Sequence, residues 1–232
     1  TVLLEKPYRV KQILHWLYKK KEIDIGKFTN LPVTLKEKIR RNCTIGCLQI
    51  ESKEKSKIDG TTRYNFLTSD GYKISAVFIP EGTRNTVCIS TQVGCSIGCT
   101  FCASGKVKFV RNLTTNEIVE QVYWIEKDVG KVNSVLFMGM GEPLLNYNNV
   151  VESIHIFLDV EMFSLSKRRT VVSTVGVVSK IYDLARENLK CKLAISLHSA
   201  NDKKRKKFVK NLNFSVEEIL NAGIFYAKKT DT

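Results

Sequence analysis

The sequence predicts an α/β fold, in which parallel strands alternate with helices, preceded by a small helical domain and a β-hairpin. Three observations support this class. The chain has 232 residues, enough to bury a core without help from disulfides. Its 43% hydrophobic and 26% charged residues are typical of a globular protein. From residue 86 onward, short apolar runs alternate with helical patterns, as in sheets whose parallel strands are joined by helical crossovers.

The first part of the chain is predicted to be helical. Residues 7–21 repeat apolar side chains at helical spacing and end in a lysine cluster, which suits the negative end of a helix. A second helix is expected over residues 31–41, with Pro32 in its first turn. We therefore predict a small basic helical domain over residues 1–47.

Residues 48–84 are predicted to form a β-hairpin that links this domain to the rest. The segments 62–68 and 72–80 are short and rich in aromatic and β-branched residues. Between them, Ser69-Asp70-Gly71 has the composition of a hairpin turn.

Residues 85–232 are predicted to contain four strand–helix units. The expected strands are 86–90, 132–137, 169–174 and 192–197, and the expected helices are 117–128, 149–159, 180–188 and 216–229. In such folds the active site lies at the carboxyl ends of the strands. Functional residues are therefore expected just after each strand.

The chain is strongly basic, and its charge is unevenly distributed. It carries 37 Lys and Arg against 23 Asp and Glu, for a net charge of +14. Residues 1–60 have a net charge of +7, residues 61–150 of +1 and residues 151–232 of +6. This pattern fits either a solvated basic surface or a surface that binds a polyanion around a neutral centre. Charge alone does not distinguish nucleic acid from an acidic membrane.

The sequence shows neither a membrane span nor a signal peptide. No apolar run approaches the ~18 residues that cross a bilayer, and Glu5 interrupts the start of the chain. We expect a cytoplasmic protein without a membrane partner. Its seven cysteines are then expected to be reduced thiols.

Three of these cysteines form the strongest local motif. Cys95, Cys99 and Cys102 have the spacing C-x3-C-x2-C and follow the strand predicted at 86–90. Structural zinc sites need four ligands, and no fourth ligand lies nearby in the sequence. Three thiolates on one loop can hold three irons of a four-iron, four-sulfur cluster and leave the fourth iron open. The surrounding glycines favour a loop over a buried strand.

The segment CSIGCTFC resembles the cluster loop of the radical S-adenosylmethionine (SAM) superfamily. The flanking segments resemble the RlmN/Cfr family of RNA adenine methyltransferases, most closely its RlmN branch, from residue 7 to residue 232; they are TVCIS, FVRNLT, MGMGEPLLNYNNV, LSKRRTVVSTVGVV and LAISLHSAND. The resemblance implies a radical SAM partial (β/α) barrel, with about four of its usual six units present here. It also implies one 4Fe-4S cluster, S-adenosyl-L-methionine, and methylation of C2 of an adenine in 23S rRNA and often also in tRNA.

This chemistry needs a radical. C2 of adenine lies between two ring nitrogens and has no lone pair with which to attack a methyl group. A one-electron route solves the problem, with the cofactors carrying the difficult step. The family also implies an electron donor such as flavodoxin, and we expect a monomer.

The resemblance assigns roles residue by residue. Cys95, Cys99 and Cys102 would bind the cluster, and Gly141 and Glu142 would receive the methionyl end of SAM. Four further positions match SAM-binding residues of the family: Ser173, Ser196, Leu197 and His198. Cys88 matches the thiol that resolves a covalent protein–RNA intermediate, although a strand cysteine is more often a small apolar core residue.

Two features depart from the family. The position thirteen residues before Cys88, a glutamate base in the family, is Ser75, whose hydroxyl is a poor base at neutral pH. Glu81 is the nearest acidic replacement. The methyl-carrying cysteine of the family, expected beyond further strands, is absent from this sequence, and the strand at 192–197 would keep an unpaired edge.

Three interpretations therefore stay open. The first is a radical SAM RNA methyltransferase whose helical domain and Lys203–Lys210 cluster bind RNA phosphates. The second is a truncated or diverged homologue that binds the cluster, SAM and RNA without completing methyl transfer. The third is a zinc-stabilised nucleic-acid-binding protein that uses the three cysteines with His198 or Cys88.

Overall fold

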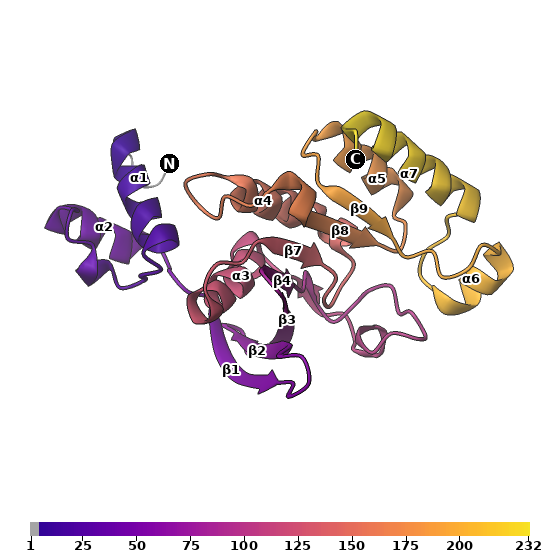
Figure 1. Ribbon diagram of the computed structural model, residues 1–232, viewed down its shortest axis with the longest axis horizontal. Helices are drawn as coiled ribbons and strands as arrows, with labels where there is room; N and C mark the ends of the chain where they lie inside the picture. Colours follow the sequence, from indigo (N-terminus) through magenta and orange to yellow (C-terminus); the bar gives the residue numbers. More distant parts are fainter. Residues whose placement is uncertain (1–4) are drawn as a thin grey trace.

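The computed structural model of the chain describes residues 5–232 and contains one large mixed sheet (Figure 1). Its strand order is β1-β2-β3-β4-β7-β8-β9. The strands are β1 Leu48–Lys55, β2 Thr62–Thr68, β3 Lys73–Glu81, β4 Arg84–Cys88, β7 Ser134–Phe137, β8 Thr170–Thr174 and β9 Lys192–Ile195. A small ribbon pairs β5 Gln92–Val93 with β6 Arg111–Asn112.

Seven α-helices accompany the sheet in the described part of the chain. They are α1 Pro7–Leu14, α2 Val33–Asn42, α3 Thr115–Val129, α4 Tyr147–Leu158, α5 Val178–Arg186, α6 Asp202–Phe208 and α7 Val216–Thr230. No helix among residues 5–232 is long and apolar enough to cross a membrane.

The parallel part of the sheet confirms the predicted α/β class. β4, β7, β8 and β9 pair in parallel, and helices separate them along the chain. The sheet is open and does not close into a full barrel. Within residues 5–232, β9 is its last strand and pairs with β8 alone.

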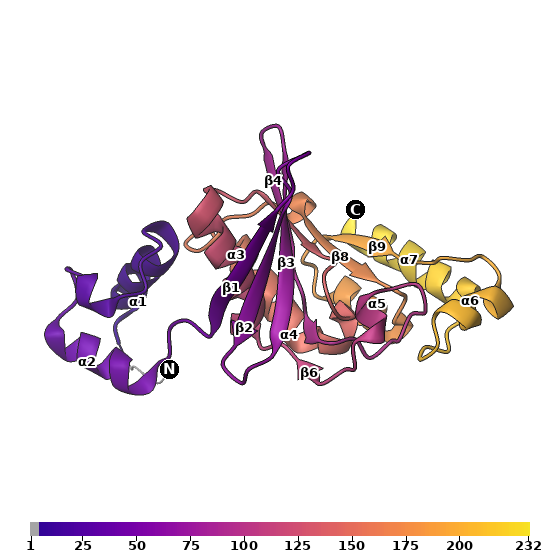
Figure 2. The same cartoon turned by 90° about the horizontal axis from the view of Figure 1, so that it is seen from below.

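The antiparallel part contains the predicted hairpin and one strand that the sequence did not predict. β2 and β3 pair around the turn at Ser69–Gly71, with Phe66 opposite Ile74. β1 adds a further antiparallel strand beside β2. Because β3 also pairs with β4, these strands extend the main sheet and do not form a separate one (Figure 2). The predicted domain limits at residues 47 and 84 stay a prediction.

Residues 7–42 form the predicted helical unit, which lies at one end of the molecule (Figure 1). α1 continues into a π-helical turn over His15–Lys19, and α2 begins after Pro32. The unit has a small core of its own, made by Ile25, Phe28, Leu31, Leu35 and Ile39. The first four residues of the predicted domain lie outside the described residues.

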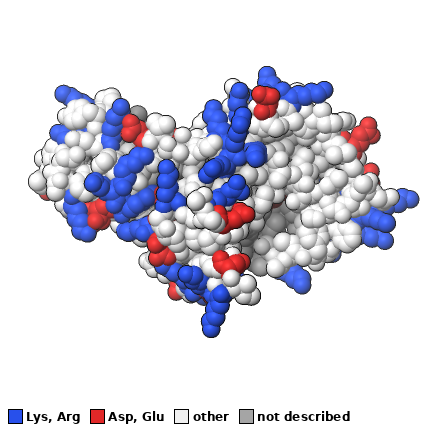
Figure 3. Space-filling view, in the orientation of Figure 1, with Lys and Arg blue, Asp and Glu red and all other residues white. Residues whose placement is uncertain are grey.

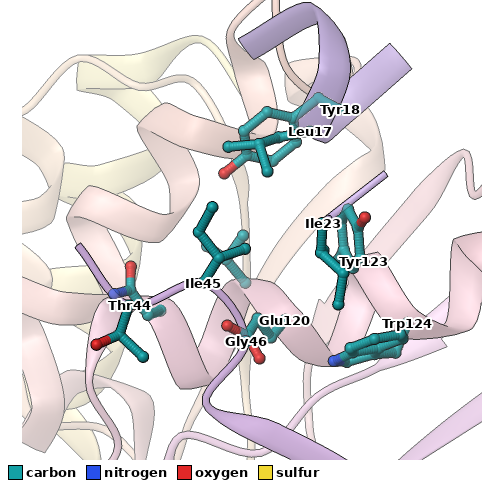
Figure 4. Close-up of a pocket in the computed structure, with 11 residues that line it drawn as sticks. Leu17, Tyr18, Ile23, Thr44, Ile45, Gly46, Glu120, Tyr123 and Trp124 are labelled. Carbon is teal, nitrogen blue, oxygen red and sulfur yellow. The ribbon is translucent and has the colours of Figure 1, made fainter. Parts of the chain in front are cut away.

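The segment that leads from the helical unit into β1 is held against α3. The carboxylate of Glu120 accepts hydrogen bonds from the backbone N–H groups of Cys47 and Leu48, at 2.8 Å for the shortest contact to each. A cavity of about 140 Å³ lies beside this contact (Figure 4). Its walls include Leu17, Tyr18, Ile45, Tyr123 and Trp124. This junction connects the helical unit to the sheet domain.

The sheet has a buried face and a half-exposed face. Ile74, Ala76 and Val87 belong to a core that also includes side chains of α3, α4 and α5. The alternate positions, among them Ser75 on β3 and Cys88 on β4, are half-buried. Because side chains alternate along a strand, these positions share the second face, which stays accessible to ligands.

Candidate functional site

A cavity of about 300 Å³ lies at the carboxyl ends of β7, β8 and β9. Four segments that are distant in sequence contribute to it. The predicted positions that line it are Cys95, Cys99, Cys102, Gly141, Glu142, Ser173, Ser196 and His198. The tertiary structure therefore brings the predicted cluster ligands and most of the predicted SAM positions to one place. Their roles stay predictions.

Three other predicted positions lie outside this lining. Leu197 follows Ser196 in the chain but is not among the residues that line the cavity. Cys88 ends β4 and lies opposite Val77 on β3 and Leu136 on β7. Ser75 is two residues from Val77 on the same strand, so it is a diagonal neighbour of Cys88, roughly 7–8 Å away on one sheet face. Ser75 and Cys88 are thus neighbours on the paired strands β3 and β4, and β4 pairs with β7, whose carboxyl end lies at the cavity.

Ser75 and Glu81 are in different positions relative to Cys88. The hydroxyl of Ser75 donates a hydrogen bond to Asn65 Oδ1 at 2.7 Å. Glu81 lies opposite Arg84, at the other end of β4, which places it roughly 13 Å along the sheet from Cys88. The structure does not support Glu81 as the acidic replacement, because strand pairing separates it from the thiol.

The cysteine loop is tightly closed at its base. β5 and β6 pair across it, and the N–H of Cys102 donates to the carbonyl of Cys99 at 3.2 Å. Gly94 has a φ of +77°, and a Cβ there would lie 2.1 Å from the carbonyl oxygen of Lys108. Only glycine allows the backbone at position 94 to come this close to Lys108, and this confirms that the glycine marks a loop.

The thiols share one electrostatic environment. Burial, together with the neighbouring Cys95 and Cys102 thiols, raises the pKa of Cys99 to about 11. Burial likewise raises the pKa of Cys95. Without a ligand these thiols are protonated at neutral pH. Binding iron would release their protons, because thiolates are the metal-binding form.

The donor set fits a cluster better than a single ion. No three His, Cys, Asp or Glu side chains among residues 5–232 converge on a point where one metal ion could bind. In an iron–sulfur cluster each thiolate binds a different iron, so the sulfurs do not need to converge. Three thiols that line one cavity with an adjacent carboxylate are therefore suited to a cluster with an open iron.

Glu142 connects the ends of two strands. Its carboxylate accepts hydrogen bonds from the N–H groups of Leu144 at 3.0 Å and Val175 at 2.9 Å. Its own N–H donates to Gln92 Oε1 at 3.0 Å. Gly141 has a φ of +105°, and a Cβ there would lie 2.7 Å from the Gln92 side chain. Burial raises the pKa of Glu142, because the charged carboxylate is poorly solvated there.

His198 and Phe101 form the rim of the cavity. Their rings lie 4.2 Å apart, and His198 adopts a left-handed φ of +61°. Burial lowers the pKa of His198, and the charge of Arg205 lowers it further. The imidazole is therefore neutral at pH 7, when it can both donate and accept a hydrogen bond.

The Lys203–Lys210 cluster is exposed at its lysines but not at Arg205. It folds into α6 and the turn that follows, and its lysines are exposed. Arg205 and Val209 are buried instead, with only 2% of Arg205 exposed. The prediction that the whole run contacts RNA is wrong for Arg205, because residues four apart share the inner face of a helix.

Sequence reasoning missed three residues that support the site. Gln92 and Val175 bind Glu142 through their amide groups, and Arg205 donates to the carbonyl of Val175. Val175 directly follows β8, and Gln92 begins β5 four residues after the end of β4, so the strand-end rule could have found Val175 and pointed near Gln92. No sequence signal distinguishes Arg205 from the lysines around it.

Comparison with known proteins agrees with this site. Residues 89–224 match the family model "Radical SAM superfamily", and residues 1–45 match "Ribosomal RNA large subunit methyltransferase N-terminal domain". The chain is similar over 97% of its length to a radical SAM methyltransferase from Sphaerobacter thermophilus, with a TM-score of 0.90 and 36% identity, and covers 67% of that protein.

Two curated relatives carry the description "Probable dual-specificity RNA methyltransferase RlmN". The one from Endomicrobium trichonymphae is 45% identical over 99% of this chain, and the one from Thermotoga neapolitana is 48% identical over 96%. The chain spans 66% of the length of each, about two thirds. The family predicted from the cysteine loop and its flanking motifs is confirmed: this chain belongs to the radical SAM superfamily and, within it, to the RlmN family.

Proposed function

We propose that this chain acts in radical SAM methylation of C2 of an adenine in 23S rRNA, and of tRNA as a second substrate. The observation that carries the proposal is the single cavity that joins the three cysteines of the loop to Glu142. The wording "dual-specificity" in the names of its relatives supports two RNA substrates.

Cys95, Cys99 and Cys102 would hold the 4Fe-4S cluster, and Gly141, Glu142, Ser173, Ser196 and His198 would hold SAM. When bound, with an electron donor such as flavodoxin, these groups supply the electron that cleaves the sulfonium and the carbon radical that results. The residues of this chain orient and enclose the ligands. Glu142 is fixed by two backbone N–H groups, so its position does not depend on the ligand.

Cys88, at the end of β4 beside β7, would resolve the covalent protein–RNA intermediate. Burial raises the pKa of its thiol, so the free protein holds it protonated at neutral pH. A base is then needed before the thiol can attack. Ser75 is beside it, but its hydroxyl donates its proton to Asn65, which does not suit a base.

Two basic surfaces would bind the RNA. Lys and Arg side chains gather over the helical unit at one end and over α6 at the other (Figure 3). The exposed lysines of α6 are Lys203, Lys204, Lys206 and Lys207. An RNA that contacts both surfaces would do so through phosphates on either side of the adenine further along its chain, with the adenine at the site between them. An RNA substrate and seven free thiols fit a protein of the cytoplasm.

Ser75 also favours a second candidate function. If no other group acts as the base in place of Ser75, the chain would bind the cluster, SAM and RNA without completing methyl transfer.

Anaerobic reconstitution with iron and sulfide tests the cofactor part of the proposal. We expect a broad absorption near ~400 nm that is lost in C95A, C99A and C102A. The matched control C43A changes an exposed cysteine away from the cavity and should keep the absorption. Protein that binds zinc alone, with no iron–sulfur spectrum, would contradict the proposal.

Incubation of the reconstituted protein with labelled SAM and either 23S rRNA or tRNA distinguishes the two candidate functions. Label on adenine C2 supports methylation. Cleavage of SAM without label on RNA supports the second candidate.

A further inference from the structure

We propose that Arg205 is a positioning residue whose buried guanidinium balances the negative charge of the cluster at Cys99 and favours its reduced state. The inference rests on the proposed function, because it assigns a residue to the proposed cluster. It concerns a side chain that neither the motifs nor the comparisons place in the site.

Arg205 lies buried on a helix whose other cations are exposed. Only 2% of the residue is accessible, while the lysines on both sides of it in α6 reach solvent. Among residues 5–232 no carboxylate lies within salt-bridge distance of its guanidinium, although the charge of Asp202, three residues earlier, raises its pKa against the effect of burial. Asp202, the acidic residue on the same helix, is exposed and accepts the N–H of Val216 at 2.8 Å.

The guanidinium is only partly satisfied by the protein. Nη2 donates to the carbonyl of Val175, and Nη1 donates to the carbonyl of Phe214 at 3.5 Å. The buried Nε–H has no partner among the described residues. A buried cation is costly unless opposite charge and hydrogen bonds compensate it. Asp202 compensates Arg205 only from the exposed side of α6, and the buried Nε–H keeps no partner among the described residues.

Three contacts place α6 and the turn after it against the cysteine loop. The N–H of Thr100 donates to the carbonyl of Phe208 at 3.0 Å. The amide of Asn211 donates to the carbonyl of Ser96 at 2.9 Å. The rings of Phe101 and Phe208 lie 6.3 Å apart in an edge contact. These contacts hold the loop backbone on both sides of Cys99.

Arg205 also reaches the wall of the cavity that Cys99 lines. Its guanidinium donates to the carbonyl of Val175, and Val175 lines the same cavity as Cys99 and Glu142. The N–H of Val175 in turn donates to the carboxylate of Glu142. The guanidinium thus lies behind the wall that the proposed cluster ligand and the proposed SAM ligand share.

A cluster on three thiolates would supply a buried negative charge on the side of the guanidinium that Asp202 does not reach. Its reduction adds one more negative charge, and a fixed positive charge nearby stabilises that state. Because the site is buried, the interaction is weakly screened by salt. A purely structural role, in which Arg205 only anchors α6 to two carbonyls, predicts no effect on the reduction equilibrium.

The test compares reconstituted full-chain variants at one fixed potential, the midpoint of the unchanged protein. R205M removes the charge and keeps a side chain of similar length. R205K keeps the charge but loses the planar guanidinium group. We expect the ratio of reduced to oxidised cluster, measured by electron paramagnetic resonance, to fall roughly tenfold in R205M and to stay near the original value in R205K. K206M, the same charge change at an exposed neighbour, should leave the ratio unchanged. An unchanged ratio in R205M would overturn the proposal.

A second measurement covers a variant that does not retain a cluster. If R205M loses the cluster, iron content is compared between R205K and R205Q. R205Q keeps hydrogen-bond donors but has no charge. Iron retained in R205K and lost in R205Q supports the charge role; equal loss in both overturns it. If the unchanged protein assembles no cluster, the proposed function fails, which is a different result from an unchanged ratio in R205M.

Discussion

Arg111 and Glu117 form two parallel hydrogen bonds, of 2.8 and 2.7 Å, between the exit of the cysteine loop and the first turn of α3. Glu117 also completes a capping box with Thr114. Arg111 donates two further hydrogen bonds, each 2.7 Å long, to Asp70 in the hairpin turn. One guanidinium therefore joins the loop, the helix and the hairpin.

Replacing Arg111 should destabilise the fold. R111M leaves the carboxylate of Glu117, which is 4% exposed, without its cationic partner. We expect a loss of about 2–3 kcal/mol in the free energy of unfolding, measured by urea denaturation. The control R63M breaks the exposed pair with Glu54 and should cost less than about 1 kcal/mol. Equal losses in both variants would contradict a special role for Arg111.

The same contact predicts a pH dependence. Hydrogen bonds from Arg111 and Thr68 hold the pKa of Asp70 well below its usual value of 3.8. A carboxyl with a lowered folded-state pKa contributes stability above its unfolded pKa and loses it as pH falls through the folded value. The stability difference between the unchanged protein and D70N should therefore shrink below about pH 4. Urea midpoints at successive pH values would show it; a constant difference would count against the ion pair.

Glu120 should control how firmly the helical unit is held. E120A removes the acceptor for the N–H groups of Cys47 and Leu48, and the loss should be about 1–3 kcal/mol. Proteolysis between residues 42 and 47 should become faster while the sheet domain stays folded. E37A, the same change at an exposed position of α2, is the control. Unchanged cleavage in E120A would show that the carboxylate does not hold the junction.

The lysines of α6 should determine the salt dependence of RNA binding. Each lysine that neutralises a phosphate contributes about 0.7–0.9 to the slope of log affinity against log salt. K206Q/K207Q should therefore lower the slope by about 1.4–1.8 if both make contact. K228Q/K229Q changes the same charge at exposed positions of α7 and should leave the slope nearly unchanged. Equal effects in both pairs would indicate general attraction without a defined contact at α6.

Local sequence was sufficient to predict the elements and the cysteine loop. The turn at Ser69–Gly71 and the strand that ends at Cys88 follow from turn chemistry and apolar periodicity, which depend on neighbours in the chain. Because parallel strands end at one edge, the convergence of Glu142 and Ser173 could also be anticipated. The unpredicted strand β1 is mostly exposed, and its alternation is too weak to be read from sequence.

Tertiary structure decided what depends on distant partners. It buried Arg205 within a basic run, because the carbonyl that accepts from it lies thirty residues earlier, at Val175. It placed Ser75 beside Cys88 and moved Glu81 to the far end of the strand, because register is set by pairing across the sheet. The sequence by itself determined the family and the ligands to expect. Only the folded chain determined which charges face the site, since burial depends on contacts that no local pattern encodes.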